Sequence, residues 1–457
     1  MREILHSLGQ LALDRPTALA LTDGPNSLTF EQLAGRVAHL AESLATAPKT
    51  IAIFAPNCID WVIADLALAL LGKTMVPLPT FFAPEQLAHI IKDAGVELIL
   101  TIAAVEPLTP ALNRPCKVLG TDETTRPFPT DLSQADAAQR IIYTSGTTGA
   151  PKGVRIGARQ IAASARGLVA ASGATAKDRY LSVLPFSLLL EQIAAICVPL
   201  LAGAPIFIAP TAAGAAQQGD LKPLIQAFEL HQPTASVLVP SLLGAWVQGL
   251  LAMRLDAPKS LRFIAVGGAP VSPAMAETAW ALGIPVHEGY GLSECCSVVS
   301  VNRPGARQAG TVGTPIEGTQ ITLVDGEIVI TGPTVMDGYL GREDVPGQTW
   351  HTGDMGEISD QGVLHILGRK DNLIITPNGR NINPEWIETL AQDAPGVLVA
   401  KLDLNLEREL VLNVTQNPGF EAQDLIDTVR AALSSAPDYA QPTHILVTAA
   451  TDTRTGT

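Results

Sequence analysis

Cysteine and basic side chains are scarce in this sequence, and each shortage argues against a class of protein. Five cysteines in 457 residues, with no Cys-x-x-Cys pair, argue against a disulfide framework and a zinc knuckle, and they favour a reducing cytoplasm. Lys and Arg number 30 against 44 Asp and Glu, which leaves a net charge of −14. Because phosphate backbones and anionic lipids repel such a chain, we expect neither nucleic acid nor a membrane surface as its partner.

Long apolar runs and a secretory leader are also lacking. The most apolar run, Trp61–Leu71, is interrupted by Asp65 and is far shorter than a bilayer span. The first residues, MREILHSLGQLALDRP, contain neither the apolar core nor the cleavage site of a signal peptide. We therefore expect a cytoplasmic protein with no integral membrane span.

The sequence does contain a regular alternation of short apolar segments and helical patterns. With 47% apolar and 16% charged residues, the chain has the profile of a packed globular protein, and its 457 residues predict two or three domains. Short apolar segments separated by helices are typical of an α/β fold with mostly parallel sheets covered on both faces. The predicted strands are 51–56, 98–100, 140–144, 180–186, 205–209, 236–240 and 261–266.

The pattern changes near residue 320. The segment Ile321–Ile330 predicts a β-hairpin, because Asp325-Gly326 at its centre suits a type I′ turn. A hairpin joins antiparallel strands, unlike the preceding pattern. We therefore expect a small antiparallel β subdomain at about residues 310–368.

A separate unit is predicted beyond Gly368. Its pattern is strand, strand, helix and strand, which suffices for a small α+β domain, and these elements are expected at 396–401, 409–414, 424–433 and 444–447. We therefore divide the chain into a large body over residues 1–368 and a small C-terminal domain over residues 369–457.

The segment Tyr143–Gly153 stands out because hydroxyl side chains alternate with glycines ahead of a lysine. Hydroxyls and bare backbone N–H groups can surround phosphate oxygens, glycines allow close approach, and a lysine adds a point charge. The segment is not a Walker A loop, in which Gly and Lys are adjacent. The alternative is a solvated turn after a strand. Its phosphate-binding candidates are Thr144, Ser145, Gly146, Thr147, Thr148, Gly149 and Lys152.

This segment resembles the phosphate loop of the adenylate-forming superfamily, which includes acyl- and aryl-CoA ligases, peptide-synthetase adenylation domains and firefly luciferase. Five further motifs follow in the superfamily's order, and together the six motifs span residues 143–388. The wording is closest to fatty-acyl-CoA ligases. The five motifs are Gly267–Pro270, Tyr290–Glu294, Gly326–Tyr339, Trp350–Asp354, and Gly368–Asp371 continuing to Gly379, Pro384 and Glu388.

The resemblance implies a reaction and a set of site residues. A carboxylic acid reacts with ATP and Mg²⁺ to give an acyl-adenylate and pyrophosphate, and the acyl group then passes to the thiol of coenzyme A. The small domain is implied to be mobile and to swing between the two half-reactions. The implied catalytic residues are Lys152, Glu294, Arg369 and the hinge residue Asp371. The other implied residues are Gly268, Ala269, Pro270, Tyr290, Gly291, Ser293, Asp354 and Arg369 for ATP or AMP, Glu294 and Thr148 for the metal, and Gly379 for pantetheine.

Elementary chemistry agrees with several of these roles and leaves alternatives. Glu294 lies in an apolar stretch, so its carboxylate needs a partner, which Mg²⁺ or a nearby Arg can supply. Asp354 can accept hydrogen bonds from both ribose hydroxyls or can be a plain turn residue. Tyr290 can stack on adenine or simply pack. The fork-shaped Arg369 suits phosphate or ribose, or a place on the surface.

The acyl pocket is expected around Phe186, Leu188, Gly267 and Val298. Leucines follow Phe186, and residues 298–301 are apolar apart from one serine. Apolar walls favour a hydrophobic, fatty-acyl-like acid and a role in fatty acid metabolism. The alternative is that each leucine simply faces the core.

Two positions depart from the superfamily's pattern. Leu188 stands where fatty-acyl members usually carry a His that lines the acid site. Thr457 follows Thr453-Arg-Thr-Gly456 at the position of the usual catalytic lysine, so relative to that pattern the small domain is truncated. Three interpretations stay open: a ligase that uses coenzyme A, a ligase that uses the phosphopantetheine of a carrier protein, and a nucleotide- or acyl-adenylate-binding protein with little turnover.

Overall fold

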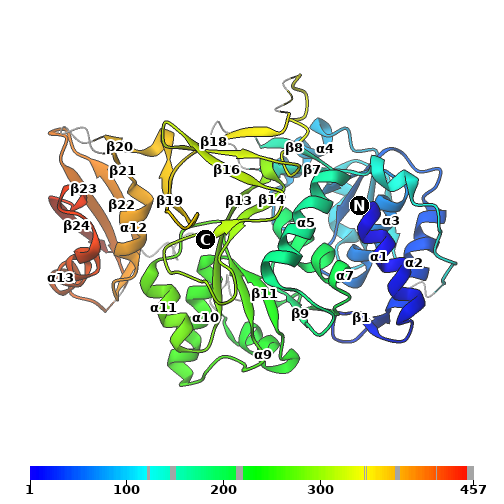
Figure 1. The fold of residues 1–457 in the computed structure, drawn as a ribbon, viewed down its shortest axis with the longest axis horizontal. Coiled ribbons are helices and arrows are strands. Elements are labelled where there is room, and N and C mark those ends of the chain that lie inside the picture. Colours follow the sequence, from blue (N-terminus) through cyan, green and yellow to red (C-terminus); the bar gives the residue numbers. More distant parts are fainter. Residues whose placement is uncertain are drawn as a thin grey trace.

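Two large β-sheets form the framework of the protein (Figure 1). The structure is a computed structural model that describes residues 1–120, 124–144, 151–212, 220–343, 345, 347–375, 381–417 and 419–449. The nine-stranded sheet has the order β15 (Thr314–Pro315), β14 (Ser297–Val301), β13 (Val286–Leu292), β12 (Phe263–Val266), β11 (Ala235–Leu238), β9 (Tyr180–Ser182), β10 (Ile206–Ile208), β1 (Leu19–Thr22), β2 (Ser27–Thr29). The six-stranded sheet has the order β6 (Cys116–Leu119), β5 (Leu98–Ile102), β3 (Thr50–Phe54), β4 (Thr74–Pro77), β7 (Gln139–Thr144), β8 (Lys152–Gly157).

Most neighbouring strands in both sheets run parallel, as the alternating sequence pattern predicts. The antiparallel pairs lie at the edges, where β2, β8, β14 and β15 join. The predicted strands are confirmed with shifts of a few residues, except that the 180–186 segment is a strand only over Tyr180–Ser182. Pro185 shortens it, because proline has no N–H to donate to a sheet.

Helices fill the space between the two sheets and cover their outer faces (Figure 1). The inner layer contains α5 (Ala158–Ser172), which contacts β8 of one sheet and β14 of the other. With it pack α1 (Arg2–Asp14), α2 (Phe30–Ser43), α3 (Ile59–Leu70), α6 (Leu189–Glu191), the π-helix η3 (Gln192–Cys197) and α7 (Val198–Ala202). The outer helices are α4 (Pro84–Asp93) on the six-stranded sheet, and α9 (Lys222–His231), α10 (Pro240–Met253) and α11 (Pro273–Ala281) on the nine-stranded sheet.

A four-stranded antiparallel sheet follows, as the hairpin pattern predicts. Asp325 and Gly326 both have positive φ, at 51° and 80°, as a type I′ turn requires. The sheet has the order β16 (Gln320–Val324), β17 (Glu327–Thr331), β18 (Thr349–Ile358), β19 (Leu364–Arg369). The short 3₁₀ segments of the chain are η1 (Glu106–Leu112), η2 (Ser133–Ala137), η4 (Ser293–Cys295), η5 (Lys370–Asn372), η6 (Leu433–Ser435) and η7 (Asp438–Ala440).

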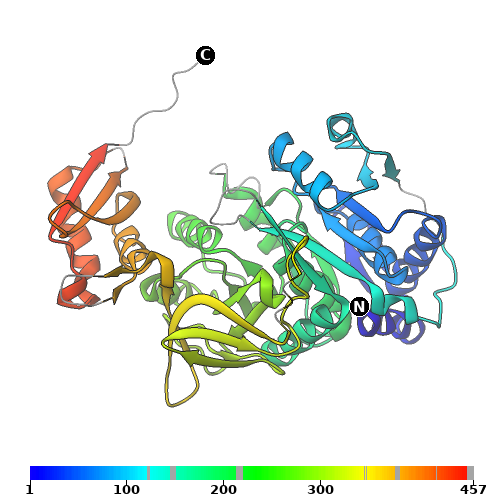
Figure 2. The same ribbon diagram turned by 90° about the horizontal axis from the view of Figure 1, so that it is seen from above.

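The last part of the chain forms its own apolar cluster at one end of the molecule (Figure 2). Its elements are β20 (Ile374–Ile375), β21 (Asn381–Ile382), α12 (Pro384–Gln392), β22 (Val397–Leu404), β23 (Leu410–Gln416), α13 (Ala422–Ala432) and β24 (His444–Ala449). Helix α12 is absent from the predicted pattern, although its start is marked by Asn383, whose side chain accepts a hydrogen bond from the Glu385 N–H, and by a proline in the first turn. The α/β fold class is confirmed, whereas the division at residue 368 stays a prediction.

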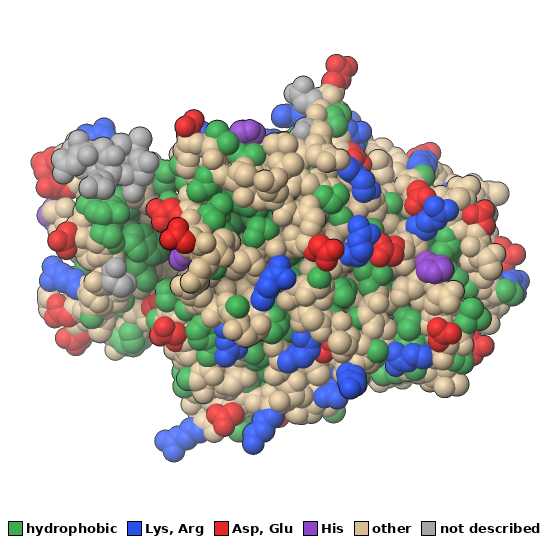
Figure 3. Space-filling model, in the orientation of Figure 1, with side chains coloured by type: hydrophobic (Ala, Val, Ile, Leu, Met, Phe, Trp, Pro, Cys, Tyr) green, Lys and Arg blue, Asp and Glu red, His purple; other side chains and the backbone are tan. Residues whose placement is uncertain are grey.

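The surface and the helices bear on the expected partners. None of the helices in the described part of the chain is long and apolar enough to cross a membrane. On the face drawn in Figure 3, basic and acidic side chains are interspersed, and no large basic patch is visible among the described residues there. This face therefore offers no electrostatic footprint for nucleic acid.

A buried ion pair links the six-stranded sheet to the inner helices. Arg140 of β7 donates two hydrogen bonds to the Asp65 carboxylate in α3, at 2.9 and 2.7 Å, and a third to Gln192 of η3 at 2.9 Å. Both charged side chains are at most 3% exposed. Since neither group can reach water, each depends on the other for its solvation.

We expect the Asp65→Leu variant to be strongly destabilised, because it leaves the Arg140 guanidinium buried without a counter-charge. The expected loss in the free energy of unfolding is about 3–5 kcal/mol. Urea denaturation followed by tryptophan fluorescence measures it, since Trp61 and Trp246 are buried in the same core. The Asp65→Leu/Arg140→Met double variant is expected to recover most of that loss, because it buries no unpaired charge. If the single and the double variant are equally destabilised, Arg140 does not depend on Asp65 for its solvation.

Candidate active site

The carboxyl ends of β12 and β13 approach each other closely because glycines stand at both. A Cβ atom on Gly267, just after β12, would lie 2.9 Å from the carbonyl oxygen of Gly289. A Cβ atom on Gly291 would lie 1.7 Å from the carbonyl oxygen of Ser297, which no side chain can tolerate. Gly268 has φ +90°, a conformation that favours glycine. Ligands of open α/β sheets bind at such strand ends.

A shared carboxylate lies beside these glycines. The Tyr290 hydroxyl donates to Asp354 Oδ2 at 2.5 Å, and Arg369 Nη1 donates to Asp354 Oδ1 at 3.0 Å. Asp354 and Arg369 are direct partners across β18 and β19, whereas Tyr290 belongs to the nine-stranded sheet. Burial, followed by the Asp354 charge, raises the pKa of Tyr290 well above its ordinary value, so the phenol stays a donor.

The site contains a second carboxylate, that of Glu294. It accepts a hydrogen bond from the Tyr339 hydroxyl at 2.7 Å, while its backbone carbonyl accepts one from the Met336 N–H at 2.8 Å. The Lys152 ammonium lies 5.8 Å from the centre of the Tyr339 ring. The Tyr339 hydroxyl therefore binds the acidic Glu294, and the Tyr339 ring lies near a basic side chain.

The Glu294 carboxylate also suits a magnesium ion. Mg²⁺ is commonly held by one or two carboxylates together with substrate phosphates, so a single acidic side chain is sufficient. The Tyr339 hydroxyl occupies Glu294 Oε1, and the carboxylate has further lone pairs available. Within the described residues no group of three or more His, Cys, Asp or Glu could hold a metal by itself. The donor set fits an ion that ATP brings with it.

The two ends of the phosphate loop are paired, since Thr144 and Lys152 face each other across β7 and β8. Ser293 begins η4, and Ala269 and Pro270 are exposed residues after Gly268. Several predicted residues lie outside the described part of the chain: Ser145, Gly146, Thr147, Thr148, Gly149, Gly379 and Thr457.

An apolar cavity of about 290 Å³ opens beside the same glycines. It runs between the nine-stranded sheet and the inner helices, along the whole length of β11 and β12. At one end it is lined by Gly268, Tyr290, Gly291 and Ser293, so it is continuous with the predicted nucleotide side. Its walls include Leu168, Leu184, Leu189, Ala194, Val198, Val237 and Val266.

Three of the four predicted acyl-pocket residues line this cavity, namely Leu188, Gly267 and Val298. In the described part of the chain Phe186 lies outside the lining. It is 1% exposed and packs against Trp61, with ring centres 5.1 Å apart. The sequence did not indicate whether Phe186, two residues before Leu188, faces the cavity or the core.

Sequence reasoning missed the polar groups around the cavity. Asp178 and Arg262 line its far end, and Glu191 lies fully buried behind the wall, hydrogen-bonded by the Ser182 hydroxyl at 2.5 Å and the Tyr180 hydroxyl at 3.3 Å. Burial raises the pKa of Glu191 to about 8, which favours the neutral form of this carboxyl. Asp178 and Arg262 are 84 positions apart in sequence, and none of these three residues belongs to a motif, which left no signal.

The predicted hinge lies where the four-stranded sheet ends. Asp371 is exposed in η5, directly after β19. The preceding Gly368 has φ +122°, and a Cβ there would lie 2.4 Å from the side chain of Asn383, which starts α12. Position 368 therefore admits glycine and no larger residue. The role of Asp371 as the hinge stays a prediction.

Comparisons of sequence identify relatives over most of the chain. The model of a family described as AMP-binding enzyme matches residues 10–340. The 2-succinylbenzoate–CoA ligase of Enterococcus faecalis is 30% identical over 420 residues, covering 84% of this chain and 82% of that protein. The ligase of the same name from Bacillus subtilis is 27% identical over 419 residues, covering 86% and 83%.

Solved structures show the same fold. The O-succinylbenzoate coenzyme A synthetase of Bacillus subtilis in complex with AMP has a TM-score of 0.78 and 26% identity, over 97% of this chain and 94% of that one. The anthranilate CoA ligase AuaEII in complex with anthranoyl-AMP has a TM-score of 0.84 over 97% and 93%, and at 20% identity this is a likeness of fold.

The comparisons decide between the interpretations of the sequence. The relatives are ligases named for an aryl acid, so the predicted role in fatty acid metabolism gains no support from them. The predicted resemblance to adenylate-forming enzymes and the prediction of an AMP-forming acid–thiol ligase are confirmed. The chain belongs to the AMP-binding enzyme family.

Proposed function

We propose that this ligase activates a hydrophobic monocarboxylic acid with ATP and Mg²⁺ and transfers the acyl group to coenzyme A. The observation that carries the proposal is the continuity of the apolar cavity with the cluster of Tyr290, Asp354 and Arg369. An acid in the cavity directs its carboxylate toward Gly268 and Tyr290, where the α-phosphate of ATP is expected.

The lining of the cavity favours an uncharged acyl tail. Among the described residues that line it, Arg262 is the one with a cationic side chain, and Asp178 neutralises it through two hydrogen bonds of 2.5 Å. The acid named for the relatives, 2-succinylbenzoate, carries a second carboxylate. Burying that charge without a free counter-charge is costly, so a diacid fits this cavity poorly.

The residues of the cluster suggest a division of roles. Asp354 accepts hydrogen bonds from the ribose hydroxyls, since its carboxylate has lone pairs beyond the two that Tyr290 and Arg369 occupy. Lys152 contributes positive charge beside the phosphates, where negative charge grows as the carboxylate attacks. Glu294 would hold Mg²⁺, which neutralises charge on the phosphates when bound.

The reaction consists of two successive displacements. A carboxylate oxygen bonds to the α-phosphorus of ATP and pyrophosphate leaves. The coenzyme A thiolate then bonds to the acyl carbon and AMP leaves. The second step uses the small domain beyond Asp371 in our proposal, because the thiol must reach an acyl carbon that the large body encloses.

A panel of acids tests the substrate class. We expect ATP–pyrophosphate exchange with octanoate to exceed that with 2-succinylbenzoate by about a hundred-fold or more, because the site leaves the second carboxylate unpaired. Benzoate separates the aromatic ring from the second charge. A preference for 2-succinylbenzoate over both monoacids would overturn the proposal.

Replacing Glu294 tests the metal role without turnover. We expect Glu294→Ala to weaken Mg-ATP binding by roughly ten- to a hundred-fold, since a charged partner of the ion is lost, while ATP without metal binds unchanged. Isothermal calorimetry measures both. Tyr339→Phe keeps the carboxylate and is expected to retain the metal dependence, and Glu97→Ala, exposed and distant, is the matched control. Equal Mg-ATP affinity in Glu294→Ala and wild type would remove Glu294 from this role.

A proline at the predicted hinge separates the two half-reactions. Because proline fixes φ, Asp371→Pro is expected to keep pyrophosphate exchange and to lose thioester formation from synthetic acyl-adenylate by roughly a hundred-fold. Asp360→Pro is the control, since Asp360 is exposed in the turn between β18 and β19. If both half-reactions survive equally in Asp371→Pro, the hinge assignment is wrong.

A further inference from the structure

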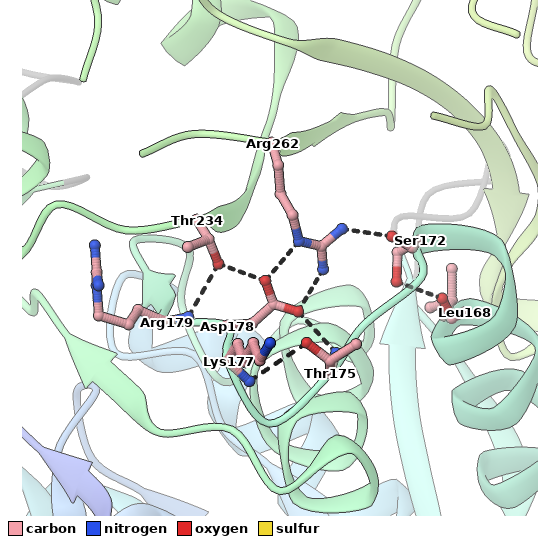
Figure 4. Close-up of polar contacts among 8 residues, drawn as sticks. All are labelled: Leu168, Ser172, Thr175, Lys177, Asp178, Arg179, Thr234 and Arg262. Carbon is pink, nitrogen blue, oxygen red and sulfur yellow. Dashed lines mark hydrogen bonds and ion pairs between the residues drawn. The ribbon is translucent and has the colours of Figure 1, made fainter. Parts of the chain in front are cut away.

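An ion pair lines the end of the cavity that lies farthest from the predicted nucleotide side. Figure 4 shows the hydrogen bonds around this pair. Arg262 precedes β12, and Asp178 lies in the connection between α5 and β9. Arg262 Nε and Nη2 donate to the two carboxylate oxygens of Asp178, each at 2.5 Å. The pair therefore ties the start of a central strand to the connection between α5 and β9.

Further hydrogen bonds hold the pair in place. Asp178 also accepts from the Thr234 hydroxyl at 2.7 Å and from the Thr175 N–H at 2.8 Å, so each carboxylate oxygen has two donors. On the other side, Arg262 Nη1 donates to the Ser172 carbonyl at 2.6 Å, near the end of α5. Figure 4 shows the guanidinium between Asp178 and Ser172. A wall with this many directed bonds resists displacement.

The pair separates an apolar cavity from solvent. The Asp178 side chain is 7% exposed and that of Arg262 is 33% exposed, so the guanidinium is the wet side of the wall. Next to Arg262 the lining is apolar, with Ala235 and Phe263 at the starts of β11 and β12. A terminal methyl group is accommodated there, whereas a longer chain meets charge.

The length of the cavity follows from its strands. From Phe263, where β12 begins, to Gly267, just after β12 ends, the chain makes four residue steps, or ~13 Å at about 3.3 Å per step. An extended chain of single bonds advances about 1.2 Å per atom, since a residue with three backbone bonds covers at most ~3.6 Å, so the cavity takes an acyl chain of about ten carbons.

We propose that the Asp178–Arg262 pair is the end stop of the acyl cavity and sets the longest acid that the enzyme activates efficiently. This inference rests on the proposed activation of a hydrophobic acid. A chain longer than the cavity must separate the pair, which leaves the buried Asp178 carboxylate without its counter-charge, or must leave methylenes outside the site. The reaction then loses the binding free energy that positions the carboxylate.

The test uses saturated straight-chain acids of six to sixteen carbons and compares kcat/KM for pyrophosphate exchange. The variant Asp178→Asn/Arg262→Ala opens the wall without leaving a buried charge unpaired, and the new amide can still accept from Thr234. For the wild type we expect kcat/KM to fall by about ten-fold or more once the acid is longer than the cavity accommodates. In the variant, kcat/KM for the sixteen-carbon acid divided by kcat/KM for the eight-carbon acid is expected to rise by at least that factor.

Two further variants keep the test decisive. Arg262→Lys retains a charge partner for Asp178 while losing the fork, so it is expected to fold and to shift the limit in the same direction by less. Thr234→Val removes one hydrogen bond to Asp178 outside the cavity lining and is expected to leave the limit unchanged. An unchanged limit in both Arg262 variants, or an equal shift in Thr234→Val, would overturn the end stop. Wild type that activates none of these acids would instead overturn the proposed substrate class.

Discussion

The site depends on the two hydrogen bonds that the Asp354 carboxylate accepts. One oxygen accepts from Tyr290 on the nine-stranded sheet and the other from Arg369 at the end of the four-stranded sheet, so this side chain links the two sheets. A charged acceptor makes both hydrogen bonds stronger than neutral ones. Arg369 is also the last residue before η5. Asp354, which faces the ribose in our proposal, therefore holds the residue from which the small domain extends.

Glycine makes that arrangement possible, and its placement explains why the site was so readable in the sequence. The backbone of Gly291 approaches that of Ser297 too closely for any Cβ, and such a position admits one residue type. Positions of this kind form fixed motifs, so the strand ends and the acidic residues beside them could be predicted from order and spacing. The fold class was predictable for a related reason, because buried parallel strands are apolar along their length.

Other parts could not be predicted, since their partners are distant in sequence. Asp178 and Arg262 are separated by 84 positions, and neither stands in a recognisable pattern before the fold brings them together. The orientation of Phe186 depended on the packing of Trp61, which no local periodicity encodes. Helix α12 is a different case, because its capping asparagine and first-turn proline are local signals within the sequence, although they overlap the last of the six motifs.

The distribution of charge around the cavity joins these observations to substrate choice. Asp178 is paired with Arg262, and burial raises the pKa of Glu191 to about 8. Pairing and burial each reduce the negative charge that an acyl tail in the cavity would meet. Beyond the other end, the Arg369 guanidinium is paired with Asp354, and the Lys152 ammonium lies 5.8 Å from the ring of Tyr339, whose hydroxyl donates to Glu294. In our proposal an apolar acyl tail therefore lies along the apolar walls toward the Asp178–Arg262 pair, and the carboxylate of the acid stays at the end beside Gly268 and Tyr290.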